Sequence, residues 1–328
     1  MSTSCNNQMR RLRPRDAKTC VVVGRAEAVA RLQPLIAAHR KGRPVRLIGP
    51  ACTPSDLNDA GAVLVVGDAR ISPRKALPGV FLQAANGRRV PAGWLPDVGD
   101  RLSTYARTAG EVQLRCQDDA ARGPFVFLSE LDDRALEVVD RVAAEMPPSE
   151  PVFRWTSERI RRDDLMAALQ GGQGAALYFG HGVARGWAGY GGFDKSSASG
   201  SRGKPLGSIL CLTCSVASRP RYGLSFCEEM VLSGLCSASL GATGRTLHES
   251  NVQLGLALAH ALRSSSVMTI SDLILSPDIR VDLLKRYRII GDPLAPLIGA
   301  AGSVEKAQAV FAPAPDDVLP VIPFSAWV

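Results

Sequence analysis

Long apolar runs are missing from this sequence, and with them most signs of a membrane-bound or exported protein. No stretch of about 18 apolar residues occurs, which argues against a membrane-spanning helix. Residues 1–18 are polar and rich in arginine, without the apolar segment of a secretory signal. The eight cysteines are scattered rather than spaced as a disulfide framework. We therefore expect reduced thiols, no membrane partner and a cytoplasmic location.

Aromatic residues are also scarce, at 5% of the chain, although the net charge is +8. The positive charge gathers in the tail of residues 1–18 and in the cluster at residues 40–43. Such clusters can attract nucleic acid or acidic partners. Proteins that bind single-stranded nucleic acid typically interleave aromatic residues with such charges. No aromatic residues are interleaved with these clusters. We therefore expect a solvated tail and helix end, and no nucleic-acid partner.

The 328 residues, 46% of them hydrophobic, are enough for two compact units. Hydrophobic periodicity predicts a first unit with strands at residues 19–24, 44–48, 62–68 and 90–94 and helices at 26–40 and 99–114. After a polar loop at 116–123, a second unit has expected strands at 125–128, 152–155, 175–180, 208–213, 237–241 and 289–293, and helices at 132–145, 162–170, 224–235 and 252–262. The alternation indicates an α/β fold with a parallel, helix-covered sheet.

Two of these expected strands each end in a potentially reactive side chain. One apolar run leads to Gly180, His181 and Gly182, and another leads to Cys214. In an open α/β sheet, ligands bind beyond the carboxyl ends of the strands. Neighbouring parallel strands would therefore bring an imidazole and a thiol to one crevice, the arrangement of a cysteine nucleophile with a histidine partner. Taken singly, each residue is more often structural, and the pairing is what favours chemistry.

The remaining cysteines and histidines are weaker candidates. Cys211 lies inside its strand, where cysteine behaves as a small hydrophobic residue. His39 and His260 fall on expected helices, and His248, in a polar loop after a strand, is the fallback. Residues 186–204 are rich in glycine and serine, so we expect a substrate-binding loop there, with a simple connector as the alternative.

Three other motifs fit less well. The glycines of residues 180–186 resemble a dinucleotide fingerprint, but the last one is a position late and no good helix follows. Cys211 and Cys214 have the spacing of a zinc-ligand pair but no second pair. A phosphate-binding loop fails because Asp194, not glycine, precedes Lys195. We therefore expect neither a cofactor nor a metal.

The sequence around the two strands resembles the gingipain family of cysteine peptidases, within the caspase-like clan. The specific parts are "GGQGAALYFGHGVARGW" around His181 and "SILCLTCSVAS" around Cys214. The segments "GLSFCEEMVLSG", "SASLGATGRT" and "IIGDPLAPL" look like later parts of the family, and "AVLVVGD" and "VPAGWLPD" fit more loosely. The resemblance covers roughly residues 19–300. Together with the composition it leads us to expect a basic flexible tail at 1–18, an N-terminal α/β subdomain at 19–118, a caspase-like catalytic subdomain at 119–300 and a proline-rich tail at 301–328. The expected fold is thus a caspase-like, gingipain-like parallel-sheet sandwich with a smaller N-terminal α/β subdomain.

The same resemblance implies roles for individual residues. Cys214 would be the nucleophile and His181 the proton donor to the leaving amine. The amides of Gly182 and Cys214 would form the oxyanion hole, and Trp187 would be a wall of the substrate cleft. The family often has glycine two residues beyond the nucleophile, where this chain has Val216. Secreted relatives carry a signal, a pro-region and an immunoglobulin-like tail that this sequence lacks, so we expect restraint by a partner or ligand instead.

An acidic pocket would select a basic residue just before the cut, since a desolvated carboxylate needs a cationic partner. In caspase-like folds this pocket receives residues from the end of the first catalytic strand, which makes Asp132 the first choice and Glu130 the second. Capping of the next helix explains Asp132 equally well. Arg185, near the histidine, would instead select an acidic residue.

The sequence therefore predicts a cysteine endopeptidase that cleaves a protein partner through a Cys–His dyad. The alternative is a caspase-like interaction module that has lost activity, against which the intact His181 and Cys214 argue.

Overall fold

A computed structural model describes residues 18–69, 77–118, 125–146, 152–157, 160–198, 203–220, 223–263 and 268–297. The side chains of residues 116–118 are not among those described. The predicted tails at 1–18 and 301–328 lie outside the described residues, apart from Lys18.

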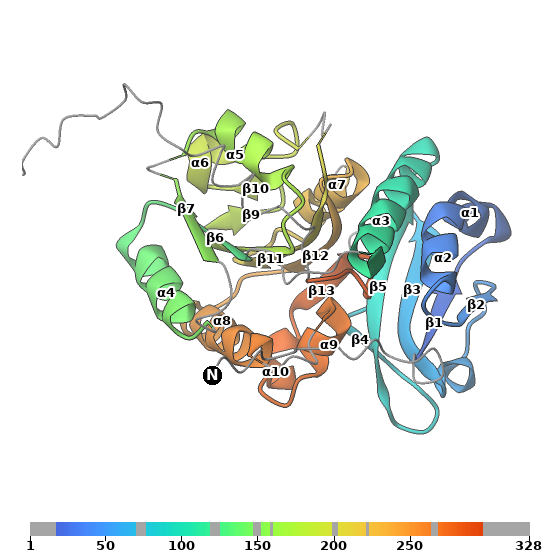
Figure 1. The fold of residues 1–328 in the computed structure, drawn as a ribbon. Helices are drawn as coiled ribbons and strands as arrows, with labels where there is room; N and C mark the ends of the chain where they lie inside the picture. Colours follow the sequence, from blue (N-terminus) through green and yellow to red (C-terminus); the bar gives the residue numbers. More distant parts are fainter. Residues whose placement is uncertain are drawn as a thin grey trace, which may run out of the picture.

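One continuous mixed sheet organises the molecule (Figure 1). Its strand order is β2-β1-β3-β5-β13-β12-β11-β8-β6-β7, with the short β4 paired to β5. The strands are β1 (Thr19–Val23), β2 (Val45–Ile48), β3 (Ala60–Asp68), β4 (Phe81–Gln83), β5 (Arg89–Asp97), β6 (Phe125–Ser129), β7 (Val152–Thr156), β8 (Ala175–Phe179), β11 (Leu206–Leu212), β12 (Cys236–Ala242) and β13 (Tyr287–Gly291). Neighbouring strands run parallel except at the β12–β13 and β4–β5 pairs. The predicted α/β class is confirmed.

Helices cover both faces of this sheet. On one face lie α1 (Ala26–Arg31), α2 (Gln33–Arg40), α3 (Asp100–Asp118), α5 (Arg162–Leu169) and α7 (Phe226–Leu232). On the other lie α4 (Asp133–Ala144), α8 (His248–Leu262), α9 (Ile270–Leu275) and α10 (Val281–Leu284). Successive residues of β6 alternate between the two cores, Phe125 and Phe127 on one side and Val126 and Leu128 on the other, as the period of a strand requires.

The expected single helix at 26–40 is wrong, because the chain forms two helices. The break falls at Leu32, which ends α1 and begins α2. Pro34 lies in the first turn of α2, where a backbone N–H has no partner within the helix. Inside a continuous helix the same proline would remove a hydrogen bond and clash with the preceding turn, so the chain breaks before it. The sequence patterns also missed the short elements η1 (Pro54–Leu57), β4, α9 and α10.

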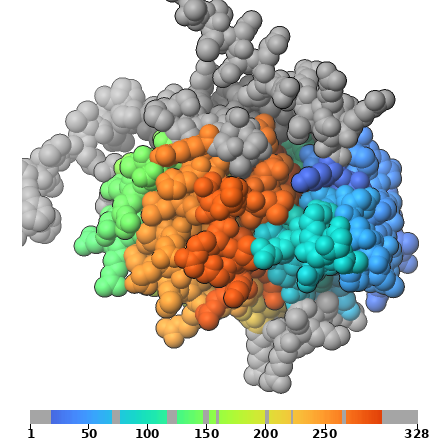
Figure 2. Space-filling view, turned by 90° about the horizontal axis from the view of Figure 1, so that it is seen from below, coloured from blue at the N-terminus to red at the C-terminus, as the bar shows by residue number. Residues whose placement is uncertain are grey.

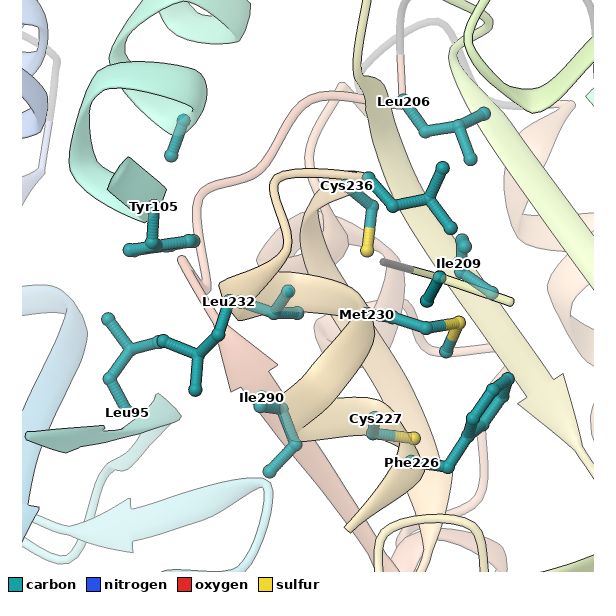
Figure 3. Close-up of a cluster of buried hydrophobic side chains, with 14 of the residues drawn as sticks. Leu95, Tyr105, Leu206, Ile209, Phe226, Cys227, Met230, Leu232, Cys236 and Ile290 are labelled. Atoms are coloured by element: carbon teal, nitrogen blue, oxygen red, sulfur yellow. The ribbon is translucent and has the colours of Figure 1, made fainter. Parts of the chain in front are cut away.

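The buried core on the α7 face joins both ends of the sheet (Figure 3). Side chains of α7, including Met230 and Leu232, point towards β11 and β13, where Ile209 and Ile290 lie, and Leu95 of β5 comes from the other side. All of these side chains are almost completely buried. At about 1.5–3 kcal/mol for each large apolar side chain removed from water, this cluster stabilises the junction of the N-terminal strands with the rest of the sheet.

Polar groups strengthen the same junction. The Tyr105 hydroxyl of α3 donates to the Ser237 carbonyl oxygen at 3.0 Å. On α2, His39 Nε2 lies 3.0 Å from Asp292 Oδ2, just after β13, and Gln113 Nε2 of α3 donates to the same oxygen at 2.8 Å.

On the opposite face, Figure 2 shows the orange surface of residues 250–290 abutting the cyan surface around β4, and Val80 belongs to the core cluster formed by α8, α9 and α10. Residues 19–97 therefore contact the rest of the molecule on both faces of the sheet.

None of the helices in the described ranges is long and apolar enough to cross a membrane. No group of three or more His, Cys, Asp or Glu side chains in those ranges is arranged to hold a metal ion.

Candidate active site

His181 and Cys214 follow neighbouring parallel strands at the same level of the sheet. In the register of β8 with β11, Phe179 pairs with Leu212, the last residue of each strand. His181 and Cys214 are each two residues further on. Because parallel strands end at one edge, the two residues follow neighbouring strands at the same edge of the sheet.

Glycine at position 182 lets the histidine turn lie directly against the cysteine turn. A Cβ atom added to Gly182 would stand 2.7 Å from Thr213 Oγ1 and 2.9 Å from the Cys214 carbonyl oxygen. Those distances are shorter than real Cβ contacts, so any larger residue would push the two turns apart. The close approach depends on glycine.

Glu130 holds the histidine from the other side. It directly follows β6, whose Ser129 pairs with Phe179 of β8. Glu130 Oε2 accepts from the His181 backbone amide at 2.8 Å. The same oxygen lies 2.8 Å from His181 Nδ1. A carboxylate accepts hydrogen bonds only, so the Nδ1 atom that faces Glu130 carries a proton. The imidazole is 78% exposed.

The Gly180 backbone is what brings Glu130 this close. Gly180 has φ +147°, and a Cβ there would meet Glu130 Cβ and the Tyr178 hydroxyl oxygen, each at 2.8 Å. The Tyr178 hydroxyl in turn donates to the His181 carbonyl oxygen at 3.2 Å and accepts from the Gly189 amide at 3.3 Å. Burial raises the pKa of Tyr178 well above its usual value, so this hydroxyl stays neutral and keeps its donor.

The turn that follows Cys214 has an uncommon backbone conformation. Ser215 has φ +58°, in the left-handed region that non-glycine residues rarely adopt. Its amide donates to the Gly244 carbonyl oxygen at 3.0 Å, which fixes the turn against the loop after β12. Val216, where the family often has glycine, is buried against Gly241. In this chain the left-handed conformation that turns the backbone after the thiol is therefore found at Ser215.

Cys214 itself is half-buried, and its sulfur has a defined neighbour. The Thr246 amide donates to Sγ at 3.3 Å, and Thr246 Oγ1 lies 3.5 Å from the same atom. Among the described residues, the Cys214 amide donates to no other group.

Trp187 does not form a wall of the cleft, and that prediction is wrong. Its side chain is 2% exposed and stacks on Tyr178 at 4.2 Å between ring centroids, with Phe193 and Phe226 on its other sides. The described part of the loop at 186–204 also contains the buried Tyr190. A cluster of this kind is worth about 0.5–1.5 kcal/mol per aromatic pair beyond the area that it buries. The aromatic side chains thus support the histidine turn from below.

The two carboxylates expected in the substrate pocket have partners within the chain. Asp132 is the N-cap of α4, and its side chain accepts from the Ala135 amide at 3.3 Å. The capping alternative is therefore the role that the structure gives Asp132. Glu130 contacts His181 instead of facing away as a pocket floor. These two side chains therefore do not support the expected preference for a basic residue before the cut.

Other cysteines and histidines are placed differently from the pair at the crevice. Of the described cysteines, only Cys52 and Cys214 are not buried. Cys211 is buried in the core, as predicted for a small hydrophobic residue. Burial raises the pKa of Cys227 and Cys236 above the usual value, which keeps these thiols protonated. His248, the fallback, is exposed at the start of α8.

This geometry agrees with a sequence match to a peptidase family. The model of peptidase family C25 matches residues 118–298, more than half of the chain. The chain belongs to this family. Its match covers every turn described above and supports a function of the cysteine-peptidase type. No curated protein matches the sequence at a significant level.

Solved structures place the C25 chain in the expected fold. A structure titled "Structure of Protease" superposes with a TM-score of 0.65 at 11% identity, over 84% of this chain and 78% of that one. The Arg-specific cysteine proteinase gingipain R gives 0.63 at 13% identity, over 85% and 78%. Its complex of pro- and mature domains from Porphyromonas gingivalis gives 0.62 at 12% identity, over 85% and 79%. Separase in the Saccharomyces cerevisiae separase–securin complex gives 0.50 at 14% identity, over 71% of this chain but only 15% of separase. At these identities the likeness establishes the fold, which is the predicted gingipain-like, caspase-like one.

Sequence reasoning found two residues of the crevice and missed their supports. The sequence indicates Glu130 for a different role. Its position directly after an expected strand is readable from the sequence, but the pairing of that strand with β8 is not. Thr246, Asn251 and Tyr287 gave no signal in the sequence. They come from a loop, a helix and a strand, and form a hydrogen-bonded chain in which Thr246 contacts the sulfur. Their meeting depends on the pairing of β12 with β13, which periodicity does not specify.

Proposed function

We propose that this C25 peptidase is a cysteine endopeptidase with Cys214 as nucleophile and His181 as its proton-transfer partner. The observation that carries the proposal is the strand register that sets both residues at one level, with Glu130 fixing the imidazole. Glu130 acts here as a positioning residue, because it contacts the imidazole and not the reacting atoms. The family match supports a peptidase but does not assign these roles.

Each chemical step then has a group to perform it. The Cys214 thiolate attacks the carbonyl carbon of the scissile peptide bond, and the amides of Gly182 and Cys214 donate to the oxyanion. The C–N bond breaks as protonated His181 gives its proton to the leaving amine. A water molecule then attacks the thioester while His181 accepts its proton. The products are a new carboxylate, a new amine and the regenerated thiolate.

A protein substrate and a regulatory protein partner complete the proposal. An exposed dyad on a packed support suits an extended peptide segment that lies across the sheet edge. Separase, which shares the fold, was solved in complex with securin, so a protein partner can bind a peptidase of this fold. We propose that a partner or ligand restrains this chain in the cytoplasm.

The test compares chain ends produced by the wild-type chain and by Cys214→Ala in a protein extract. New amino termini should accumulate with wild type and with the control Cys52→Ala, and not with Cys214→Ala. Cys52 suits as a control because it is the other half-exposed cysteine of the described residues and lies far along the sheet, after β2. Identical sets of termini from wild type and Cys214→Ala would favour the inactive interaction module.

A further inference from the structure

The sulfur of Cys214 lies at the end of a chain of hydrogen bonds from three other elements. The nearest donor is the Thr246 backbone amide, 3.3 Å from Sγ. The Thr246 hydroxyl oxygen lies 3.5 Å from Sγ, and the protonated thiol donates to the Thr246 carbonyl oxygen at 3.7 Å. Thr246 belongs to the loop between β12 and α8, so its position relative to the thiol depends on what holds that loop.

Asn251, on the first turns of α8, ties this loop to the strand that carries the thiol. Its Nδ2 donates to Thr246 Oγ1 at 3.1 Å and to the Leu212 carbonyl oxygen at 3.1 Å. Leu212 is the last residue of β11, two positions before Cys214. One side-chain amide therefore fixes the distance between the thiol's own strand and the amide that faces the sulfur.

Tyr287, at the start of β13, orients that side chain. Its hydroxyl donates to Asn251 Oδ1 at 2.9 Å, so the NH₂ group of Asn251 must point towards Thr246 and Leu212. Tyr287 is 3% exposed, and burial raises its pKa above the usual value, with the Cys211 and Cys214 thiols acting in the same direction. The hydroxyl is therefore a permanent donor across the pH range in which a peptidase works.

We propose that Asn251 and Tyr287 are positioning residues that hold the Thr246 amide on the sulfur and so stabilise the thiolate of Cys214. The inference rests on the proposed function in one respect, that Cys214 is the nucleophile. A hydrogen bond to the charged form of an acid favours that form, and only the thiolate attacks a carbonyl. The hydrogen-bonded chain thus controls how much of the thiol is reactive at neutral pH.

Charged and titratable groups on the elements next to the thiol must be kept constant in a test. The strands, turns and loops beside it carry His181 with Glu130, Cys211, Arg219, Arg245, His248, Tyr287 and Arg288. None of these changes in Asn251→Ala or in variants of Thr246. A change in the pH profile of those variants is therefore attributable to the lost hydrogen bonds.

The experiment measures the rate of Cys214 alkylation by iodoacetamide against pH, with peptide mapping of the modified residue. In Asn251→Ala we expect the profile to move up by roughly half a unit to one unit, which lowers the rate near neutral pH about 3- to 10-fold. Thr246→Val and Tyr287→Phe should show smaller shifts in the same direction, and Thr246→Ser should restore the wild-type profile. The matched control is Asn58→Ala, because the Asn58 side chain also ties a loop, by accepting from the Asn86 amide in the N-terminal half.

The outcomes separate three cases. A profile of Asn251→Ala that overlays the wild type, or a fall by one factor at every pH, would overturn the proposal. If Asn251→Ala does not fold, Thr246→Val decides in the same way. Because iodoacetamide needs no peptide recognition, a shifted profile in a chain that cleaves no peptide would refute the proposed function and leave the positioning role standing.

Discussion

Two histidines of this protein each contact a carboxylate, and their surroundings differ completely. His181 Nδ1 lies 2.8 Å from Glu130 Oε2, with the imidazole 78% exposed at the sheet edge. His39 Nε2 lies 3.0 Å from Asp292 Oδ2, with 2% and 0% of the two side chains exposed. The same pair of groups is therefore open to a substrate in one place and sealed between α2 and β13 in the other.

The buried pair is held by more partners than the exposed one. Asp292 also accepts from Gln113 Nε2 and from the Leu294 amide. Burial acts to raise the pKa of Asp292, but His39 and these hydrogen bonds outweigh it and lower that pKa below the usual value. Groups fixed in this way join two parts of the fold, whereas the exposed pair has one ring nitrogen left for proton transfer. Both pairs consist of an imidazole and a carboxylate, so it is burial that distinguishes the pair that holds the fold together from the pair that is open to solvent.

The largest expected effect is on stability, at the buried pair. Asp292→Asn and His39→Ala should each lower the free energy of unfolding by about 3–5 kcal/mol, because each leaves a buried partner without its counterpart. Chemical denaturation at pH 7 measures the loss. Values within 1 kcal/mol of wild type would show that the pair does not hold the N-terminal strands to β13.

The pH dependence of the same pair has a definite sign. The pKa of Asp292 is lowered in the folded state relative to about 3.9 in an unfolded chain. Its contribution is therefore complete above the unfolded value and is lost as the pH falls through the folded value. The stability difference between wild type and Asp292→Asn should shrink as denaturation curves are recorded at successively lower pH below about 4. A difference that grows on acidification would contradict this assignment.

At the exposed pair the effect should fall on turnover. His181→Ala should lower kcat by roughly 100-fold or more, the usual worth of general acid–base catalysis, with little change in melting temperature. The matched control is His260→Ala, because His260 forms another exposed pair, 3.1 Å from Glu145. Unchanged turnover in His181→Ala, with loss in His248→Ala, would show that His248 is the imidazole that transfers the proton.

A smaller effect is expected at Glu130, which orients the imidazole without touching the substrate. Glu130→Gln keeps an acceptor for the His181 amide but removes the negative charge, so we expect kcat to fall about 10-fold, less than for a lost proton-transfer group. A rise in KM alone, with kcat unchanged, would instead indicate that Glu130 binds substrate, as the sequence first indicated.

The smallest effect is expected at Asp132. Removal of an N-cap side chain costs about 1 kcal/mol, so Asp132→Ala should lower stability by that amount through α4. Turnover of peptides with arginine, lysine or aspartate before the cut should stay the same relative to one another. Selective loss of the arginine and lysine peptides would restore Asp132 as the pocket carboxylate.

Most of the strands were readable from the sequence, because buried strands of an α/β sheet are short apolar runs with clear ends. His181 and Cys214 followed from the same reading, since each ends such a run. The antiparallel pairing of β13 with β12 was not readable, although it brings Tyr287 towards Asn251. Strand order depends on contacts far apart in the chain, which local patterns do not record.

Side-chain roles at the crevice were harder to predict than positions. Trp187 follows the histidine turn closely in sequence, so a place in the cleft was reasonable, but its large apolar ring is more stable stacked on Tyr178. Asp132 and Glu130 differ by two residues and have unrelated partners, a helix amide and an imidazole. Which way a loop side chain faces is decided by neighbours from other strands.

The most direct test of the central claim is to identify the cysteine that reacts with a thiol-reactive peptide analogue. Of the described cysteines, Cys52 and Cys214 are the two that are not buried, so both can compete for the label. We expect peptide mapping to find the label on Cys214, with Cys52 unmodified, and labelling to be lost in Cys214→Ala and reduced in His181→Ala. Equal labelling of Cys52 and Cys214, or undiminished labelling of Cys214→Ala, would contradict the account.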